Sequence, residues 1–308
     1  ANGIGKTTLL KSILQLIKPY SGKVHLGDYQ HIGYFEQESD TQNTSTCIEE
    51  IWSEFPAMTQ YEIRSMLAKC GLTTKHIESQ VRVLSGGEQA KVRLCKILNR
   101  ESNILLLDEP TSFLDIRHKL ELLTILKQMV LDHQLTVIMS LHELDLAQKI
   151  SDKVICVHGE YIEKYGAPEE IFTSEYIRKL YGITRGSYNA AFGCVEMDPP
   201  RGEPQVFVIG GNGSGIPYYR KLQRQGIPFA AGVLHTNDVD CQVAGALADQ
   251  VITEKPFESI SQESYDKAVE LMKKCQKVIC PLKDFGTVNA ANRELLRLAR
   301  ELGILAEL

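Results

Sequence analysis

The chain opens with a short glycine-containing loop that leads directly into a helix-forming segment. Gly5, Lys6 and Thr7 match the end of the pattern G-x-x-x-x-G-K-T, and residues 8–17 carry leucine and isoleucine at helical spacing. The backbone N–H groups of such a loop, at the N-terminus of a helix, are well placed to hold phosphate. The pattern therefore predicts an α/β fold with a phosphate-binding loop, and we expect the first glycine of the loop and the strand that leads into it to lie before Ala1.

Two apolar segments farther along the chain predict neighbouring parallel strands. Residues 103–108 and 135–140 are short apolar runs, and the helical periodicity of residues 119–131 between them predicts a right-handed βαβ unit. Polar residues follow both strands: Asp108 and Glu109 end the first, and His142 follows the second. Taken singly, these would be solvated acids and a loop histidine.

The rest of the first half predicts a helical insert at about residues 45–100, because residues 49–70 and 87–98 have the spacing of amphipathic helices. Other expected elements are strands at 23–26 and 32–35, and a hairpin that pairs 153–157 with 161–164.

A second domain is expected after a linker at residues 186–203, which are rich in Gly, Ser, Asn and Pro. The first domain then spans residues 1–185 and the second residues 204–308. In the second, a strand at 206–209 precedes further strands near Val251 and Val278, with helices at 242–247, 265–274 and 291–302. This alternation predicts a small Rossmann-like, doubly wound α/β domain.

The hexapeptide Leu84-Ser85-Gly86-Gly87-Glu88-Gln89 narrows the prediction further. Its small residues open a helix whose free N–H groups can face a phosphate. Together with the loop at Lys6, the acid pair and His142, it resembles the ATP-binding cassette (ABC) ATPases in order and spacing over about residues 1–182. The resemblance implies an α/β P-loop NTPase fold of the ABC nucleotide-binding type, truncated at its first strand and carrying a helical insert, and it implies MgATP hydrolysis.

The resemblance also assigns roles in catalysis and binding. Lys6 would neutralise the β- and γ-phosphates, and Glu109 would polarise the attacking water as general base. His142 would contact the γ-phosphate, and Gln37 would sense Mg²⁺ and the water. The residues expected to bind ATP are Asn2, Gly3, Gly5, Lys6, Thr7, Thr8, Ser85, Gly86, Gly87 and Asp115, and those expected to hold Mg²⁺ are Thr7, Asp108 and Gln37.

ABC ATPases close their sites in pairs, which the resemblance extends to this chain. Ser85 and Gly87 would complete the site of the partner subunit, and Asp115 would help across the interface. A homodimer or a paired cassette is therefore expected.

Different parts of the chain resemble different branches of this family. Residues 1–110, including the run 84–94, resemble soluble F-type proteins that act on ribosomes as translation or antibiotic-resistance factors. Residues 111–182 resemble ATPase subunits of importers for iron-chelate, haem or cobalamin compounds, through 140–147 and 166–172. This change of resemblance near residue 110 has three possible sources: a recombinant gene, an artificially joined sequence or a divergent importer.

We favour the importer because it accounts for the longer remainder of the chain, and because a single cassette without a charged inter-cassette linker is present. The F-type function is the alternative, and a cassette ATPase of a non-transport machine is a third.

Charge and hydropathy bear on the partners. The formal net charge of -5 gives no overall positive field, so we expect no direct DNA binding. Apolar runs fall far short of the roughly 20 residues of a membrane-spanning helix. The importer interpretation therefore requires a separate membrane permease and a cytoplasmic location at the inner face of the cell membrane, whereas the F-type alternative requires the ribosome.

The glycine-rich residues 210–215 follow a strand, as dinucleotide-binding loops do, but Ile216 stands where the pattern G-x-G-x-x-G needs its last glycine. A packing turn is therefore favoured, with a nucleotide or another anion as the alternative because Asp238 lies roughly where a ribose-binding acid would. We hypothesise that this domain is regulatory and senses a small ligand.

The eight cysteines are scattered and form no CxxC pair, so reduced, mostly buried thiols are expected. Metal binding by Cys275, Cys280 and His235 is a minor alternative.

Overall fold

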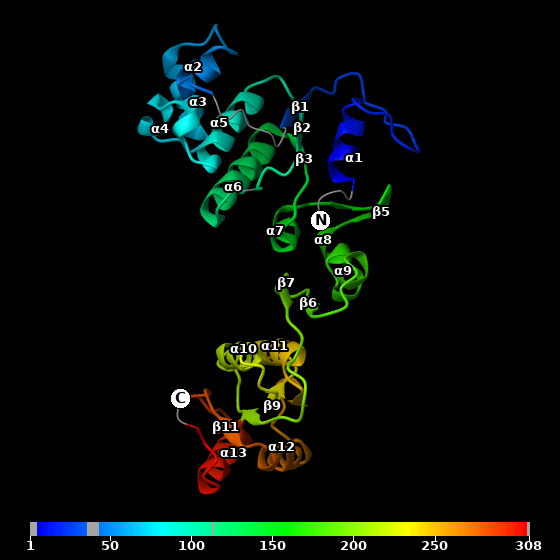
Figure 1. Ribbon diagram of the computed structural model, residues 1–308, viewed down its shortest axis with the longest axis vertical. Helices are drawn as coiled ribbons and strands as arrows, with labels where there is room; N and C mark the ends of the chain where they lie inside the picture. The colour runs from blue at the N-terminus through cyan, green and yellow to red at the C-terminus, as the bar shows by residue number, and fades with distance from the viewer. Residues whose placement is uncertain (1–4, 36–42, 113, 307–308) are drawn as a thin grey trace. The chain divides into compact units, whose positions relative to one another are not determined.

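The computed structural model describes residues 5–35, 43–112 and 114–306, and it divides into two compact units, Ala1–Ile171 and Phe172–Leu308 (Figure 1). Of the predicted site residues, Asn2, Gly3 and Gln37 lie outside the described part of the chain.

The first unit contains a parallel sheet in the order β1-β2-β3, formed by Ile32–Phe35, Ile104–Leu107 and Thr136–Met139. Ile104 pairs with both Ile32 and Thr136 in register. The β2 residues Leu105, Leu106 and Leu107 are fully buried, which explains why the sequence there is uniformly apolar. The βαβ unit is confirmed, with α6 (Ile116–His133) as its connection.

The helical insert consists of α2 (Cys47–Trp52), α3 (Gln60–Lys69), α4 (Thr74–Glu78), the 3₁₀ turn η1 (Val81–Val83) and α5 (Gly86–Leu98). Its own core includes Cys47, Ile51, Ile63 and Leu67. The single helix expected at 49–70 is wrong, because the chain breaks between α2 and α3 in a segment that contains Pro56, and Thr59 caps a new helix there.

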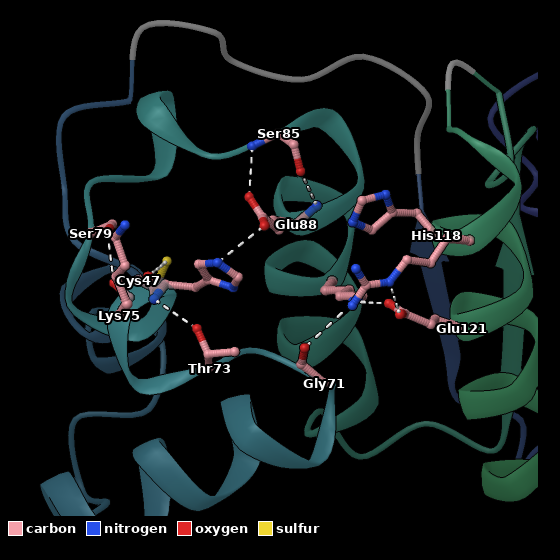
Figure 2. Close-up of polar contacts among 12 residues, drawn as sticks. Cys47, Gly71, Thr73, Lys75, Ser79, Ser85, Glu88, His118 and Glu121 are labelled. Carbon is pink, nitrogen blue, oxygen red and sulfur yellow. Dashed lines mark hydrogen bonds and ion pairs between the residues drawn. The ribbon is translucent and has the colours of Figure 1, made fainter.

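One buried lysine joins the insert to α6. The Lys91 ammonium contacts the Glu121 carboxylate of α6 and lies 3.4 Å from the carbonyl oxygen of Gly71, which follows α3 (Figure 2). The side chain of Lys91 is 5% exposed and that of Glu121 is 34% exposed. Hydrogen bonds from Lys91, and then from Arg117, lower the pKa of Glu121 to about 2. A single side chain thus connects α3, α5 and α6.

The remaining elements of the first unit are α1 (Lys6–Ile13), α7 (Leu144–Ile150), the antiparallel pair β4 (Val154–His158) and β5 (Tyr161–Gly166), and α8 (Pro168–Ile171). The strand predicted at residues 23–26 is wrong: this segment has no sheet partner in the described structure and carries no strand.

The second unit begins with α9 (Ser174–Leu180) and a hairpin of β6 (Ser187–Asn189) and β7 (Cys194–Glu196). We predicted a linker at residues 186–203, whereas the structure places this hairpin there and buries Tyr188. The division of the chain also falls earlier than the predicted end at residue 185, between Ile171 and Phe172.

A parallel sheet with helices on both faces makes up the rest of this unit (Figure 1). The strand order β10-β9-β8-β11 is doubly wound: alternate residues of β8 and β9 point into two cores, one shared with α10 and α11 and the other with α12 and α13. The elements are β8 (Val206–Val208), α10 (Ile216–Arg224), β9 (Phe229–His235), α11 (Val239–Leu247), β10 (Gln250–Glu254), α12 (Gln262–Lys274), β11 (Lys277–Ile279) and α13 (Ala290–Glu301).

All eight cysteines are free thiols, and five are buried, as expected from their scattered positions. Within the described ranges, no cluster of His, Cys, Asp and Glu has the arrangement of a metal site, and Cys275, Cys280 and His235 form none. Among the described helices, none combines the length and apolar character needed to cross a membrane.

Candidate functional site

The acid pair lies at the C-terminal end of β2, where Ser140 from the end of β3 holds both acidic residues. The Ser140 hydroxyl donates a hydrogen bond to Oδ1 of Asp108 at 2.8 Å and accepts the backbone N–H of Glu109 at 2.8 Å. Asp108 is 3% exposed, so this hydroxyl satisfies a carboxylate that is nearly removed from water. Ser140 was not predicted as a site residue. Its position two residues before the predicted site residue His142 could have indicated it.

The second acid of the pair, Glu109, lies close to Lys6 and His142. The Lys6 Nζ lies 3.0 Å from Nδ1 of His142 and 3.6 Å from Oε1 of Glu109, and Nε2 of His142 contacts the same carboxylate oxygen. The Lys6 Nζ also lies 3.1 Å from Nε2 of the same ring, so the ammonium approaches both ring nitrogens. Three predicted site residues from three separate segments therefore meet.

Glu109 is held in its ionised form. Burial raises its pKa, but the hydrogen bond and charge of His142, the Ser112 hydroxyl and the Lys6 ammonium together lower the pKa below its ordinary value. The backbone φ of Glu109 is 48°, in the left-handed region that non-glycine residues rarely adopt and that is concentrated at functional sites. An ionised carboxylate that is fixed in direction can accept a proton, and the lowered pKa makes it a weaker base than a free glutamate.

Gly5, directly before Lys6, has a backbone geometry that suits glycine. Gly5 has φ 86° and precedes α1, and a Cβ there would lie 2.9 Å from the carbonyl oxygen of Gly159. Glycine is therefore required for two independent reasons. Thr7 and Thr8 occupy the first turn of α1, Thr8 exposed and Thr7 half-buried.

The remaining predicted residues form a second group. The polar side-chain contacts of Ser85 are with Glu88 and those of Asp115 with His118, and both Ser85 and Asp115 are exposed. Gly86 is exposed and Gly87 is buried. The structure thus gathers Lys6, Asp108, Glu109 and His142 in one place and gives Ser85 and Asp115 other partners.

An open groove of about 560 Å³ follows β3 and reaches Lys6. Its lining includes Leu10, Leu126, Val137 and Ile150. Within the described sheet β3 is an edge strand, paired only with β2.

Residues 1–112 match the family described as ABC transporter. The ferric enterobactin transport ATP-binding protein FepC of Escherichia coli is 30% identical over 232 residues, which cover 68% of this chain and 82% of FepC. The chain belongs to the ATP-binding cassette ATPases.

Three further similarities concern parts of the chain. The uncharacterized ABC transporter ATP-binding protein YfmM of Bacillus subtilis is 58% identical over 151 residues, which are 49% of this chain but only 28% of YfmM. The fold resembles that of a solved metal-chelate type ABC transporter in an inward-facing conformation, with a TM-score of 0.52 at 24% identity over 59% of this chain and 75% of that one. Residues 229–306 match the MJ0874 family.

The glycine-rich loop of the cassette ATPase's second unit already has an anionic partner within the protein. The backbone N–H groups of Gly211 and Gly215 donate to the fully buried Asp240 carboxylate, and that of Asn212 donates to Asp238 at 2.8 Å. Burial raises the pKa of Asp240, and these backbone hydrogen bonds oppose the rise. A phosphate at this loop would have to compete with a built-in carboxylate for the same donors.

Replacing Asp240 with Ala is therefore expected to destabilise the second unit by about 2–4 kcal/mol, because several buried N–H groups lose their acceptor. Asp238→Ala, which removes the cap of α11 and the acceptor of the exposed Asn212 N–H but leaves Asp240 in place, is the comparison and should cost about 1 kcal/mol. Hydrogen exchange at the amides of Gly211 and Gly215 in the intact protein measures the effect. Equal protection in both variants would show that Asp240 is not their essential acceptor.

Proposed function

We propose that this protein binds and hydrolyses MgATP as a head-to-tail dimer and energises an importer for an iron-chelate, haem or cobalamin-type compound. The observation that carries the ATPase part is the meeting of Lys6, Glu109 and His142 beside Asp108 at the end of a parallel sheet. The importer part rests on the FepC similarity and on the pattern of residues 111–182.

Lys6 and the loop amides would bind the phosphates in this proposal. Lys6 begins α1, so its ammonium lies at the N-terminus of a helix, where the backbone dipoles add positive potential. Burial lowers the pKa of Lys6, but the carboxylates of Glu109, Asp108 and Glu143 oppose the change. Lys6 can thus exchange a carboxylate partner for a phosphate oxygen of the nucleotide.

The donor set beside the phosphates fits Mg²⁺. Asp108 and Thr7 supply carboxylate and hydroxyl oxygens, which are the ligands this ion prefers, and Gln37 is assigned to the same ion. In the described structure the Ser140 hydroxyl donates to Oδ1 of Asp108 and so holds the carboxylate that would bind the ion. When bound, Mg²⁺ would neutralise charge on the phosphate oxygens.

Proton removal falls to Glu109. Its ionised carboxylate would accept a proton from the attacking water, while His142, which already contacts Glu109, would orient toward the γ-phosphate. Ser112 donates to the other carboxylate oxygen at 3.1 Å and helps to fix its direction.

The exposed group of Ser85, Gly86 and Asp115 would act on the nucleotide of a partner subunit. Ser85 caps α5 by accepting the N–H of Glu88, and the remaining N–H groups of the first turn would bind a second phosphate. In a head-to-tail pair, each copy would supply this exposed group to the nucleotide that is bound at Lys6 of the other copy. Bound ATP would therefore hold the dimer together.

The importer and F-type functions predict different partners. We favour a permease partner and a position at the inner face of the membrane, and the similarity of residues 1–110 to F-type proteins keeps ribosome binding as the second candidate. The test is to purify the tagged intact protein from solubilised membranes and, in parallel, to sediment it with ribosomes in the presence of MgATP. A complex of two copies with a polytopic membrane protein supports the importer; co-sedimentation with ribosomes and no membrane complex would replace it with the F-type function.

A further inference from the structure

The first turn of α5 is closely covered by a side chain from α6. Gly87 is buried, and a Cβ at this position would lie 2.4 Å from Cγ of His118. The imidazole therefore occupies the space that any larger residue at position 87 would need. Figure 2 shows His118 extending from its helix toward the turn that contains Ser85 and Glu88.

The same imidazole is bound to Asp115, the N-cap of α6. Oδ1 of Asp115 accepts the backbone N–H of His118 at 2.9 Å, and Oδ2 lies 2.9 Å from Nδ1 of the ring. The backbone hydrogen bond, and then the side-chain bond, lower the pKa of Asp115. The carboxylate thus accepts a hydrogen bond from Nδ1–H. The ring is fixed in direction, and its Cγ and Cδ2 atoms pack on Gly87.

The opposite side of this turn is fixed by the insert. Glu88 accepts the backbone N–H of Ser85 at 2.8 Å, and its other oxygen lies 3.2 Å from Nε2 of His76 in α4 (Figure 2). The first turn of α5 is therefore held by the insert on one side, and His118 of α6 contacts it on the other.

We propose that His118 is a positioning residue that sets the N-terminus of α5 relative to Asp115. In the proposed dimer, a partner subunit would contact two segments at once: residues 85–87 at the start of α5 and Asp115 at the start of α6. His118 touches both segments. This inference rests on the proposed dimer. It assigns His118 no contact with ATP and no share in the chemistry.

Three substitutions separate the two contacts of His118. His118→Phe keeps a ring over Gly87 but cannot donate to Asp115. His118→Asn keeps a donor near the position of Nδ1 but loses most of the ring, and His118→Ala loses both. His133→Ala, an exposed histidine in the last turn of the same helix, is the control.

The test measures ATP-dependent dimerisation by sedimentation velocity in the Glu109→Gln background, where hydrolysis does not release the dimer. Positioning through Asp115 predicts that His118→Ala and His118→Phe raise the dimer dissociation constant about tenfold, and that His118→Asn restores it to within about threefold of the parent. Binding of ATP to the monomer, measured at low protein concentration, should be unchanged in all variants, as should dimerisation of His133→Ala.

The alternative outcomes are distinct. If His118→Phe behaves like the parent and His118→Asn like alanine, the ring only packs on Gly87 and the positioning role is wrong. If all three variants dimerise like the parent, His118 has no role in assembly. Failure of the Glu109→Gln parent itself to dimerise with ATP would overturn the proposed dimer instead, and thermal melts exclude misfolding of any variant.

Discussion

Glu109→Gln is expected to lower steady-state ATP turnover by about 10²–10⁴-fold while MgATP still binds. The amide keeps the size and most hydrogen bonds of the side chain, but it cannot accept a proton from water. Lys6 and the N-terminus of α1, which would bind the phosphates, are unaltered. The measurement is phosphate release at saturating ATP, together with nucleotide affinity in the same preparation of the intact protein.

The control for this substitution is Glu101→Gln, which makes the same chemical change at an exposed position before β2. It should leave turnover within about twofold of the parent, as surface changes usually do. Turnover that survives in Glu109→Gln would mean that another group removes the proton, and the assignment of the base would have to be abandoned.

Lys6→Ala is expected to weaken MgATP binding about 10- to 100-fold. Hydrogen bonds between charged partners contribute roughly 1.5–3 kcal/mol each, and the substitution removes the ammonium closest to the expected phosphates. It also removes the partner of His142 and Glu109, so turnover should fall further than affinity. Equilibrium binding of a fluorescent ATP analogue, with unlabelled ATP as competitor, gives the affinity directly.

Lys18→Ala serves as the comparison, because Lys18 is exposed and follows α1 outside the loop. Both variants remove one positive charge, so a general electrostatic effect would weaken binding equally in both. An undiminished affinity in Lys6→Ala would contradict its role as the phosphate ligand.

The local pattern was enough to predict the part of the site that lies at the ends of strands. Uniformly apolar runs predicted two buried parallel strands. Both strands form, but β2 is buried whereas β3, at the edge of the described sheet, stays partly exposed. Of the polar residues that follow the strands, Glu109 and His142 are in contact, and Ser140 holds Asp108 beside them. Strand neighbours are fixed by the short βαβ connection, so little long-range information was needed.

Other features depended on contacts that the pattern does not encode. Residues 23–26 alternate like a strand, but a strand also needs a partner edge, and the described structure gives them none. The hairpin of β6 and β7 is rich in turn residues and was predicted as a linker, although Tyr188 is buried there. The roles of Ser140, which binds both acids, and of His118, which packs on Gly87, could not be predicted from spacing. Each of these two side chains contacts residues that are distant in the sequence.

Lys91 determines where the insert can bend. The buried Lys91 ammonium, in the middle of α5, contacts the end of α3 and the second turn of α6, so sliding α3 against α6 would separate a buried charge from its acceptors. With allowance for the partly exposed Glu121, that separation costs on the order of 1–2 kcal/mol at neutral pH. These three helices should therefore turn as one rigid body, and any pivot must lie in the connections around it rather than within their packed contact.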